Sequence, residues 1–300
     1  MAIFAIRFTG PQGLNTLICP GGLHMTHFWK KFLIGCGAAI AMASGVQYSH
    51  ASSIGVEPLF LEVTPTQSAA IRVRNTSEDS IPVEVLVFKR DVDAAGVQTR
   101  VPADDDFIIF PPQASLKPSA TQVFRLRPLD ATKANSQSYY VSFRQVPAQL
   151  EPTEQDGARV QVVFSFDAAV HVVPRKAQSA VALKTAKLSE MTLTEATGEV
   201  KSLKNGRQVD VTKEVTVPAV EIEIENSGNK YLYLNEQEYT ATVTDISGQT
   251  STHKWVNEDV SKHVKVTLLE PKEARVFTLP LPKDVVPSSV DVSVRKRKAF

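Results

Sequence analysis

The chain has 300 residues, of which 43% are hydrophobic and 22% are charged, and its formal net charge is +1. This length suits about two domains with folded cores, and the balanced charge argues against a nucleic-acid-binding protein. The sequence contains no Gly-rich phosphate loop, no nucleophile elbow and no spacing typical of metal ligands. We therefore expect no enzyme activity, no metal and no cofactor.

The first fifty residues predict export from the cytoplasm. We interpret residues 1–24, which show no clear pattern, as an over-extended beginning of the reading frame. Residues 25–51 combine a short basic region, an apolar run of about 15 residues and a small-residue exit, which is typical of a cleaved signal peptide. Cys19 and Cys36 both precede the expected cleavage point, so the exported protein would contain no disulfide. We expect a periplasmic protein.

Residues 52–174 predict a first domain made of short strands. Apolar and polar residues alternate over short stretches that are separated by turn-forming residues, and no helical periodicity interrupts them. The expected strands are residues 59–63, 70–74, 82–88, 107–110, 122–126 and 139–143. Short strands at this spacing are typical of an all-β sandwich.

A second, smaller β-sandwich is expected over residues 177–300, after a change of composition at Pro174. The expected strands are residues 181–183, 217–224, 231–234, 239–243, 264–269 and 276–279. Residues 226–229 (Asn-Ser-Gly-Asn) predict a hairpin turn. Residues 201–213 are polar, and we expect a mobile loop there.

The longest predicted strand covers residues 160–172. Its even-numbered positions form an unbroken apolar row, whereas its odd-numbered positions are smaller and more polar. The usual strand length is roughly 5–6 residues. Such a strand either packs in a sandwich core or offers its apolar row to another chain, and the segment alone leaves both interpretations open.

Several motifs together resemble the PapD-type periplasmic chaperones, which assemble surface pili through an outer-membrane usher. The resemblance extends over about Val56 to Leu281 and is strongest in the first domain. The motifs that carry it are Phe110-Pro111-Pro112, Leu116-x-Pro118, Phe124-Arg125-Leu126, Tyr139 to Pro147, and the long strand that leads to Pro174.

The resemblance implies two immunoglobulin-like sandwiches in tandem and a binding role without catalysis. In that family the last strand of the first domain lends an apolar row to a pilin subunit that lacks its own final strand. By position, the donated residues would be Val160, Val162, Phe164 and Phe166. The implied partners are pilin-like subunits and the usher. The sequence leaves open whether the free protein dimerises through the same edge.

One part of the family pattern is missing. The family holds the carboxylate at the subunit's C-terminus with an arginine on the first strand and a lysine near the end of the long strand. Here Ala169 stands in place of the lysine, and residues 56–63 contain no Arg or Lys. Either the strand does all the holding, or the anchor has moved, the candidates being His171, Arg175, Lys176, Arg72 and Arg74.

Two other functions fit the same sequence. The chain could be an exported adhesin or structural protein built from two immunoglobulin-like modules, in which the long strand is buried core. It could also be a periplasmic holdase that works without an usher. Arg125 and Arg144 match family positions, and we expect both to stabilise the sandwich.

Overall fold

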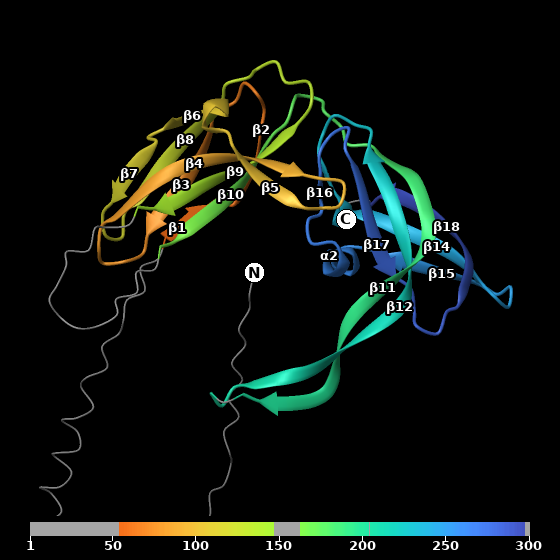
Figure 1. Ribbon diagram of the computed structural model, residues 1–300. Coiled ribbons are helices and arrows are strands. Elements are labelled where there is room, and N and C mark those ends of the chain that lie inside the picture. Colours follow the sequence, from red (N-terminus) through yellow and green to blue (C-terminus); the bar gives the residue numbers. More distant parts are fainter. Residues whose placement is uncertain (1–53, 147–162, 204, 298–300) are drawn as a thin grey trace, which may run out of the picture. The chain divides into compact units, whose positions relative to one another are not determined.

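The computed structural model describes residues 54–146, 163–203 and 205–297 (Figure 1). Strands dominate these residues. Besides strands, the described chain contains the short helix α2 (Glu258–His263) and the 3-10 turns η1 (Asp104–Asp106) and η2 (Leu234–Glu236). No helix in the described ranges is long and apolar enough to cross a membrane.

The first sandwich consists of two sheets. One has the order β1 (Ile54–Glu57), β3 (Ala69–Asn75), β8 (Thr121–Pro128) and β6 (Phe107–Phe110). The other has the order β2 (Phe60–Val63), β10 (Ser165–Val172), β9 (Gln137–Gln145), β4 (Ile81–Val92) and β5 (Gln98–Pro102), with β7 (Gln113–Leu116) also paired to β4. Only β2 and β10 pair in parallel among the described strands of this sandwich.

Alternation along the strands places the core between these two sheets. Phe124 of β8 meets Phe143 of β9 across the sandwich, with ring centroids 5.3 Å apart. Phe107 packs edge-on against Tyr139 at 4.9 Å. Both pairs are buried, and aromatic pairs in this edge geometry stabilise a core beyond their burial alone.

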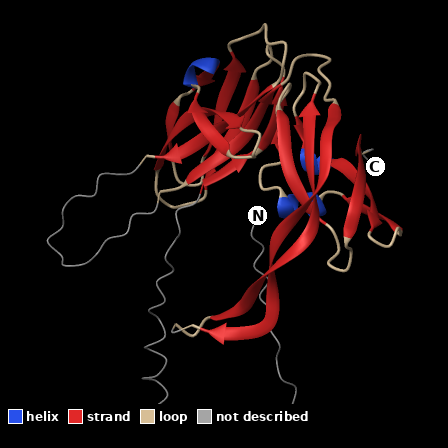
Figure 2. Cartoon of the chain, turned by 45° about the vertical axis from the view of Figure 1, so that its right-hand side comes forward, coloured by secondary structure: helices blue, strands red, loops and turns tan. Residues whose placement is uncertain are grey.

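The second sandwich has a core of its own. Its strands are β11 (Val181–Ser202), β12 (Gln208–Asn226) and β17 (Ala274–Pro280) in one sheet, and β15 (Thr250–Trp255), β14 (Gln237–Asp245) and β18 (Pro287–Lys296) in another. The short strands β13 (Leu232–Tyr233) and β16 (Leu268–Leu269) pair with each other. Ile222, Ile224, Tyr239 and Phe277 are among the core side chains. The prediction of an all-β chain with two immunoglobulin-like sandwiches is confirmed (Figure 2).

The expected loop at residues 201–213 is wrong. β11 continues to Ser202, and β12 begins at Gln208 after a tight turn in which Gly206 adopts a positive φ of 78°. The Gly206 amide donates to the Leu203 carbonyl at 2.9 Å. An Asn-Gly pair followed by alternating valines is a hairpin signal, and the high polarity of the segment hid it.

The expected hairpin turn at residues 226–229 is also wrong, because β12 pairs with β11 and β17, whereas β13 pairs with β16. The cause is the side chain of Asn226, which is fully buried. It donates to the Lys230 carbonyl at 2.8 Å and accepts from the Ala180 amide at 3.3 Å. These bonds fix the bend after β12, so that the following strand β13 joins a different sheet.

Asn75 plays a similar part in the first sandwich, where it ends β3. Its buried amide nitrogen donates to the carbonyls of Asp79, Leu116 and Lys117 at 2.6, 3.0 and 3.1 Å. Its oxygen accepts from the Ser77 amide at 2.8 Å. One side chain therefore satisfies backbone groups from two segments of the chain.

We expect Asn75→Ala to lower the free energy of unfolding by about 2–4 kcal/mol, because it leaves several buried backbone groups without a partner. Gln113→Ala, at an exposed position of β7, should change it by less than about 0.5 kcal/mol. Urea denaturation of both variants measures the difference. Equal stability of the two would show that Asn75 does not hold the end of β3.

Candidate functional site: the edge strand β10

β10 has a complete set of neighbours over only half of its length. It pairs with β9 from Ser165 to Val172, but with β2 only from Ala169 to Val172. The Ala169 amide donates to the Leu59 carbonyl at 2.8 Å, and among the described residues no strand pairs with β10 on that side before this point. The segment from Val163 to Ala168 is therefore an open sheet edge.

The backbone of this segment is directed outward at alternate residues. The Phe164 carbonyl accepts from the Gln145 amide of β9 at 2.9 Å, so even-numbered residues bond to β9. Residues of odd number, here Val163, Ser165 and Asp167, turn their amide and carbonyl groups to the open side. Such a row of groups is a template for another strand.

The side chains of β10 change from buried to exposed along the strand. Ala168, Val170 and Val172 lie in the core, and Phe166 packs against it while half-buried. Phe164 is also half-buried, and its ring stacks on that of Phe166 with centroids 6.5 Å apart. Val163 is 42% exposed.

Of the four predicted donor residues, the structure brings Phe164 and Phe166 together at the open edge. Val160 and Val162 lie outside the described residues. The predicted apolar row is confirmed from Phe166 to Val172, where it faces the core. The donor role itself stays a prediction.

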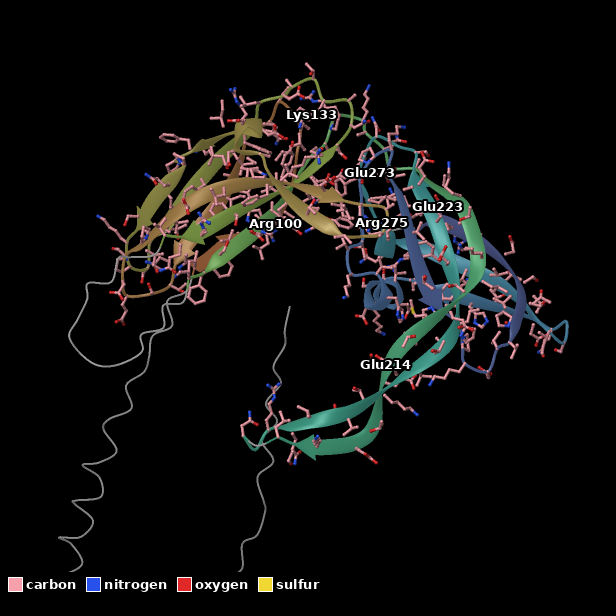
Figure 3. All side chains as sticks on the ribbon, in the orientation of Figure 1. Arg100, Lys133, Glu214, Glu223, Glu273 and Arg275 are labelled. Carbon is pink, nitrogen blue, oxygen red and sulfur yellow. The ribbon has the colours of Figure 1, made fainter. Side chains whose placement is uncertain are left out.

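Polar contacts fix the other face of the same sheet. Asp167 accepts a hydrogen bond from Arg100 of β5 at 2.7 Å. Arg100 is labelled in Figure 3. Tyr140 lies between Arg90 and Arg100, whose guanidinium carbons are 4.4 and 4.7 Å from the ring centroid. Arg144 pairs with Glu84 of β4 at 2.6 Å. These contacts tie β10, β9, β4 and β5 into a stiff platform for the edge.

At its other end β10 contributes His171 to a buried aromatic cluster. The imidazole Nδ1 bonds to the Ser138 hydroxyl at 2.6 Å, and Nε2 bonds to the Tyr233 hydroxyl at 3.0 Å. The ring stacks on Tyr231 with centroids 4.0 Å apart and contacts Phe60 at 5.1 Å. Burial, assisted by the charge of Arg90, lowers the His171 pKa to about 3, so the imidazole is neutral at pH 7.

A carboxylate and a lysine lie beside this cluster. Glu62 of β2 accepts hydrogen bonds from the Tyr231 hydroxyl and from Lys230, whose ammonium is 2.8 Å from Oε1. Burial alone would raise the Glu62 pKa, but the hydrogen bonds from Lys230 and Tyr231 outweigh it and lower the pKa. Phe60, Glu62, Lys230 and Tyr233 contribute to the wall of a cavity of about 750 Å³.

The five predicted carboxylate anchors do not form one site. His171 is buried, with both ring nitrogens engaged. Arg175 and Lys176 are exposed in the turn after β10. Arg72 and Arg74 are exposed on β3, which belongs to the other sheet.

Sequence reasoning missed Lys230 and Glu62 as a pair. They come from different domains, 168 residues apart, and only the fold brings them into contact. Lys230 follows the Asn-Ser-Gly-Asn segment, whose interpretation as a hairpin turn placed it at a surface corner. Within the described residues, no group of acidic, histidine or cysteine side chains could hold a metal ion.

The residues that form most of the first sandwich match a known protein family. Residues 61–178 match the model described as pili and flagellar-assembly chaperone, PapD N-terminal domain. The matched residues, which include β10, are therefore similar to a PapD-type chaperone domain, and the resemblance seen in the sequence is confirmed. The family is a chaperone family for pilus assembly.

Solved structures of fimbrial chaperones are similar over most of their length. The class 5 fimbriae chaperone CfaA is 13% identical, with a TM-score of 0.47, over 83% of this chain and 94% of that chain. The E. coli chaperone DraB is 14% identical, with a TM-score of 0.43, over 83% and 98% of the two chains. A chain in the Salmonella enterica SafA pilin complex with the SafB chaperone is 15% identical, with a TM-score of 0.43, over 82% of this chain and 98% of that chain. No curated protein sequence matches the chain.

We expect the stability of the protein to vary with pH because of Glu270, which lies next to the aromatic cluster around His171. Its buried carboxyl accepts from the Ser138 amide at 3.0 Å, and burial, followed by repulsion from Glu273, raises its pKa to about 7. A carboxyl with a raised pKa favours folding while it is protonated, and this contribution is lost as the pH rises from about 4.5 through 7.

We expect Glu270→Gln to raise the melting temperature at pH 8, where the wild type must bury a charge, by an amount that corresponds to at most about 3 kcal/mol. At pH 4.5 the two proteins should melt together. Calorimetry at both pH values tests this. A stabilisation that is the same at both would exclude the ionisation of Glu270 as its cause.

Proposed function

We propose that the protein is a periplasmic chaperone that binds pilin-like subunits by donor-strand complementation and delivers them to an outer-membrane usher. The donor is the segment that leads into β10, with Val160, Val162, Phe164 and Phe166 as its apolar residues. Residues 25–51 act as the cleaved export signal.

The open edge of β10 is the observation that carries this proposal. Within the described ranges, the strand has a fixed neighbour on one side only between Val163 and Ala168, and two half-buried phenylalanines lie at the same place. A subunit that lacks a strand exposes both unpaired backbone groups and an apolar groove. One donated strand satisfies both needs, and each buried Val or Phe contributes roughly 1.5–3 kcal/mol before ordering costs.

We further propose that the strand does the holding, without a cationic anchor for the subunit's carboxylate. The ammonium of Lys230 is already paired with Glu62, and His171 is neutral with no free nitrogen. A carboxylate that replaced Glu62 would have to displace a bound carboxylate and leave it unpaired. This exchange therefore gives no net gain in binding free energy.

Phe164→Asp should abolish subunit capture, because it places a charge in the apolar groove of the subunit. We expect at least about a 100-fold loss of affinity. Ser165→Asp is the matched control, since it adds the same charge one residue later on the opposite face of the strand, and it should retain most of the binding. Pull-down of the tagged chain from the periplasm, with identification of the captured subunits, measures both.

The fold of both variants is checked by thermal unfolding. If Phe164→Asp unfolds while Ser165→Asp does not, Phe164 is part of the core and the donor proposal fails. If both fold and neither the wild type nor the control captures a β-rich subunit, the chain is better explained as an exported adhesin or structural protein.

The double variant Arg175→Ser, Lys176→Ser should bind the captured subunit within about threefold of the wild-type affinity, which corresponds to less than about 0.7 kcal/mol. Both side chains are exposed and neither is part of the open edge. Titration of purified subunit at low and high salt measures this. A loss of affinity of 30-fold or more, larger at low salt than at high salt, would show that these cations anchor the subunit's carboxylate.

A further inference from the structure

The hairpin of β11 and β12 continues well beyond the second sandwich as a two-stranded ribbon (Figures 1 and 2). We call the part from Met191 to Val217 the arm. β17 pairs with β12 only between Ala219 and Glu225, and the last bond on that side runs from the Leu281 amide to the Pro218 carbonyl at 2.8 Å. Pro282 follows directly and has no amide hydrogen to continue the ladder.

The arm therefore has an open edge on β12. The Val211 carbonyl accepts from the Thr197 hydroxyl of β11, so odd-numbered residues face β11, whereas the Pro218 carbonyl faces the other way. Even-numbered residues thus turn their backbone groups outward. They are Asp210, Thr212, Glu214 and Thr216, and Glu214 is labelled on the arm in Figure 3. No described strand pairs with them there.

The arm is also amphipathic. One face carries Met191, Leu193, Val209, Val211, Val215 and Val217, and within it Glu195 stands opposite Lys213. At the base of this face Val217 is buried, and Glu195 pairs with Lys283 at 2.6 Å, so the outer residues Val209 and Val211 are the ones left half-buried. The other face carries Thr192, Thr194, Asp210, Thr212, Glu214 and Thr216. A two-stranded ribbon is at best marginally stable alone in water, and three or more strands with an apolar face are needed for stability. The arm lacks this third strand.

We propose that the missing strand is the arm of a second copy of this chain, paired antiparallel along β12 and centred on Val211. A twofold axis at this residue joins the two ribbons into one four-stranded sheet. This interface uses residues of the second sandwich alone, so it stands apart from the open edge of β10 and from the proposed chaperone function.

The charges along β12 select this register. Centring on Thr212 would place Asp210 opposite the second copy's Glu214, and centring on Lys213 would place two lysines opposite each other. Like charges directly opposite each other destabilise a sheet. Centring on Val215 would bring Pro218 into the ladder, where it cannot donate.

Centring on Val211 avoids all three problems. The valines of the two copies face each other, and Lys213 lies opposite the second copy's Val209. On the polar face Asp210 lies opposite Thr212, and Glu214 lies opposite Gln208. This register keeps the apolar row of each copy on the same side of the joined sheet.

Single cysteines test the register directly. We would use the full chain with Cys19→Ser and Cys36→Ser, so that no natural cysteine remains whether or not residues 25–51 are cleaved. Val211→Cys should form an intermolecular disulfide, because Cα atoms in such a non-hydrogen-bonded pair are about 4.5 Å apart, within the range for a disulfide. Val209→Cys is the matched control, since its copies would be about 13 Å apart along the strands.

We expect most of the Val211→Cys protein to run as a covalent dimer on a non-reducing gel, and the Val209→Cys protein to run as a monomer. No dimer from Val211→Cys, or equal amounts of dimer from both, would overturn the proposal. Mass spectrometry of the cross-linked band establishes that both halves are this chain. A band that joins Val211→Cys to a different protein would also overturn it.

A second pair of variants tests the open edge of β12 without introducing a disulfide. Thr212→Pro removes an outward amide of β12 and should weaken dimerisation at least tenfold in analytical ultracentrifugation. Thr194→Pro is the matched control on the outer edge of β11, where Glu214 is its register partner, and should leave dimerisation unchanged. A wild-type chain that stays monomeric at concentrations of about 100 µM, far above those at which standard-size interfaces associate, would overturn the proposal as well.

Discussion

The parallel pairing of β10 with β2 begins only at Ala169, and this single constraint divides β10 into two halves with different neighbours. Beyond Ala169 the strand has neighbours on both sides, and Val170 and Val172 are fixed in the core. Before Ala169 it has one neighbour, yet it cannot move freely, because β9 holds every residue from Ser165 onward. A donated strand needs this combination, since an edge that is already straight and in register loses little entropy when a partner pairs with it.

The buried cluster at the end of β10 explains how the strand is held. His171 is neutral because burial opposes its charge, so it can stack on Tyr231, contact Phe60 and still bond to two hydroxyl groups. The charged pair of Glu62 and Lys230 lies at the border of the cluster, where both groups remain partly exposed. The charge of this pair is thus kept at the border, and His171 itself makes only neutral hydrogen bonds inside. This arrangement avoids the cost of burying an unpaired ion.

Alternation in the sequence was sufficient to predict the strands that have one wet and one dry face. Residues 70–74 and 122–126 became β3 and β8 because their apolar residues recur every second position and meet one core. The same rule failed for the outer part of the arm, where Val209 and Val211 are only half-buried and polar residues dominate. The Asn-Gly pair at residues 205–206 was the available signal, and it outweighs polarity because it specifies a turn geometry.

The candidate site was predictable only where it depends on one strand. Phe164 and Phe166 follow from the alternation of their own segment. The contact between Lys230 and Glu62 does not, because it depends on the turn that Asn226 makes by bonding to Lys230 and Ala180. Local patterns carry no information about a carboxylate 168 residues away. The same limit applies to the predicted anchors, of which Arg72 and Arg74 lie on β3 in the other sheet.

The described edges of β10 and of the arm differ in what they offer to a partner. At β10 the exposed groups lie beside large aromatic side chains, and the neighbouring sheet is stiffened by Arg90, Arg100 and Tyr140. On the arm the side chains are mostly valine and threonine, with charges at intervals that restrict the register. An edge with large apolar side chains fits a groove that lacks a strand, whereas an edge with spaced charges fits a flat ribbon of matching sequence. The chemistry of each edge would therefore separate the two proposed partners, because a groove needs large apolar side chains and a flat ribbon needs a matching pattern of charges.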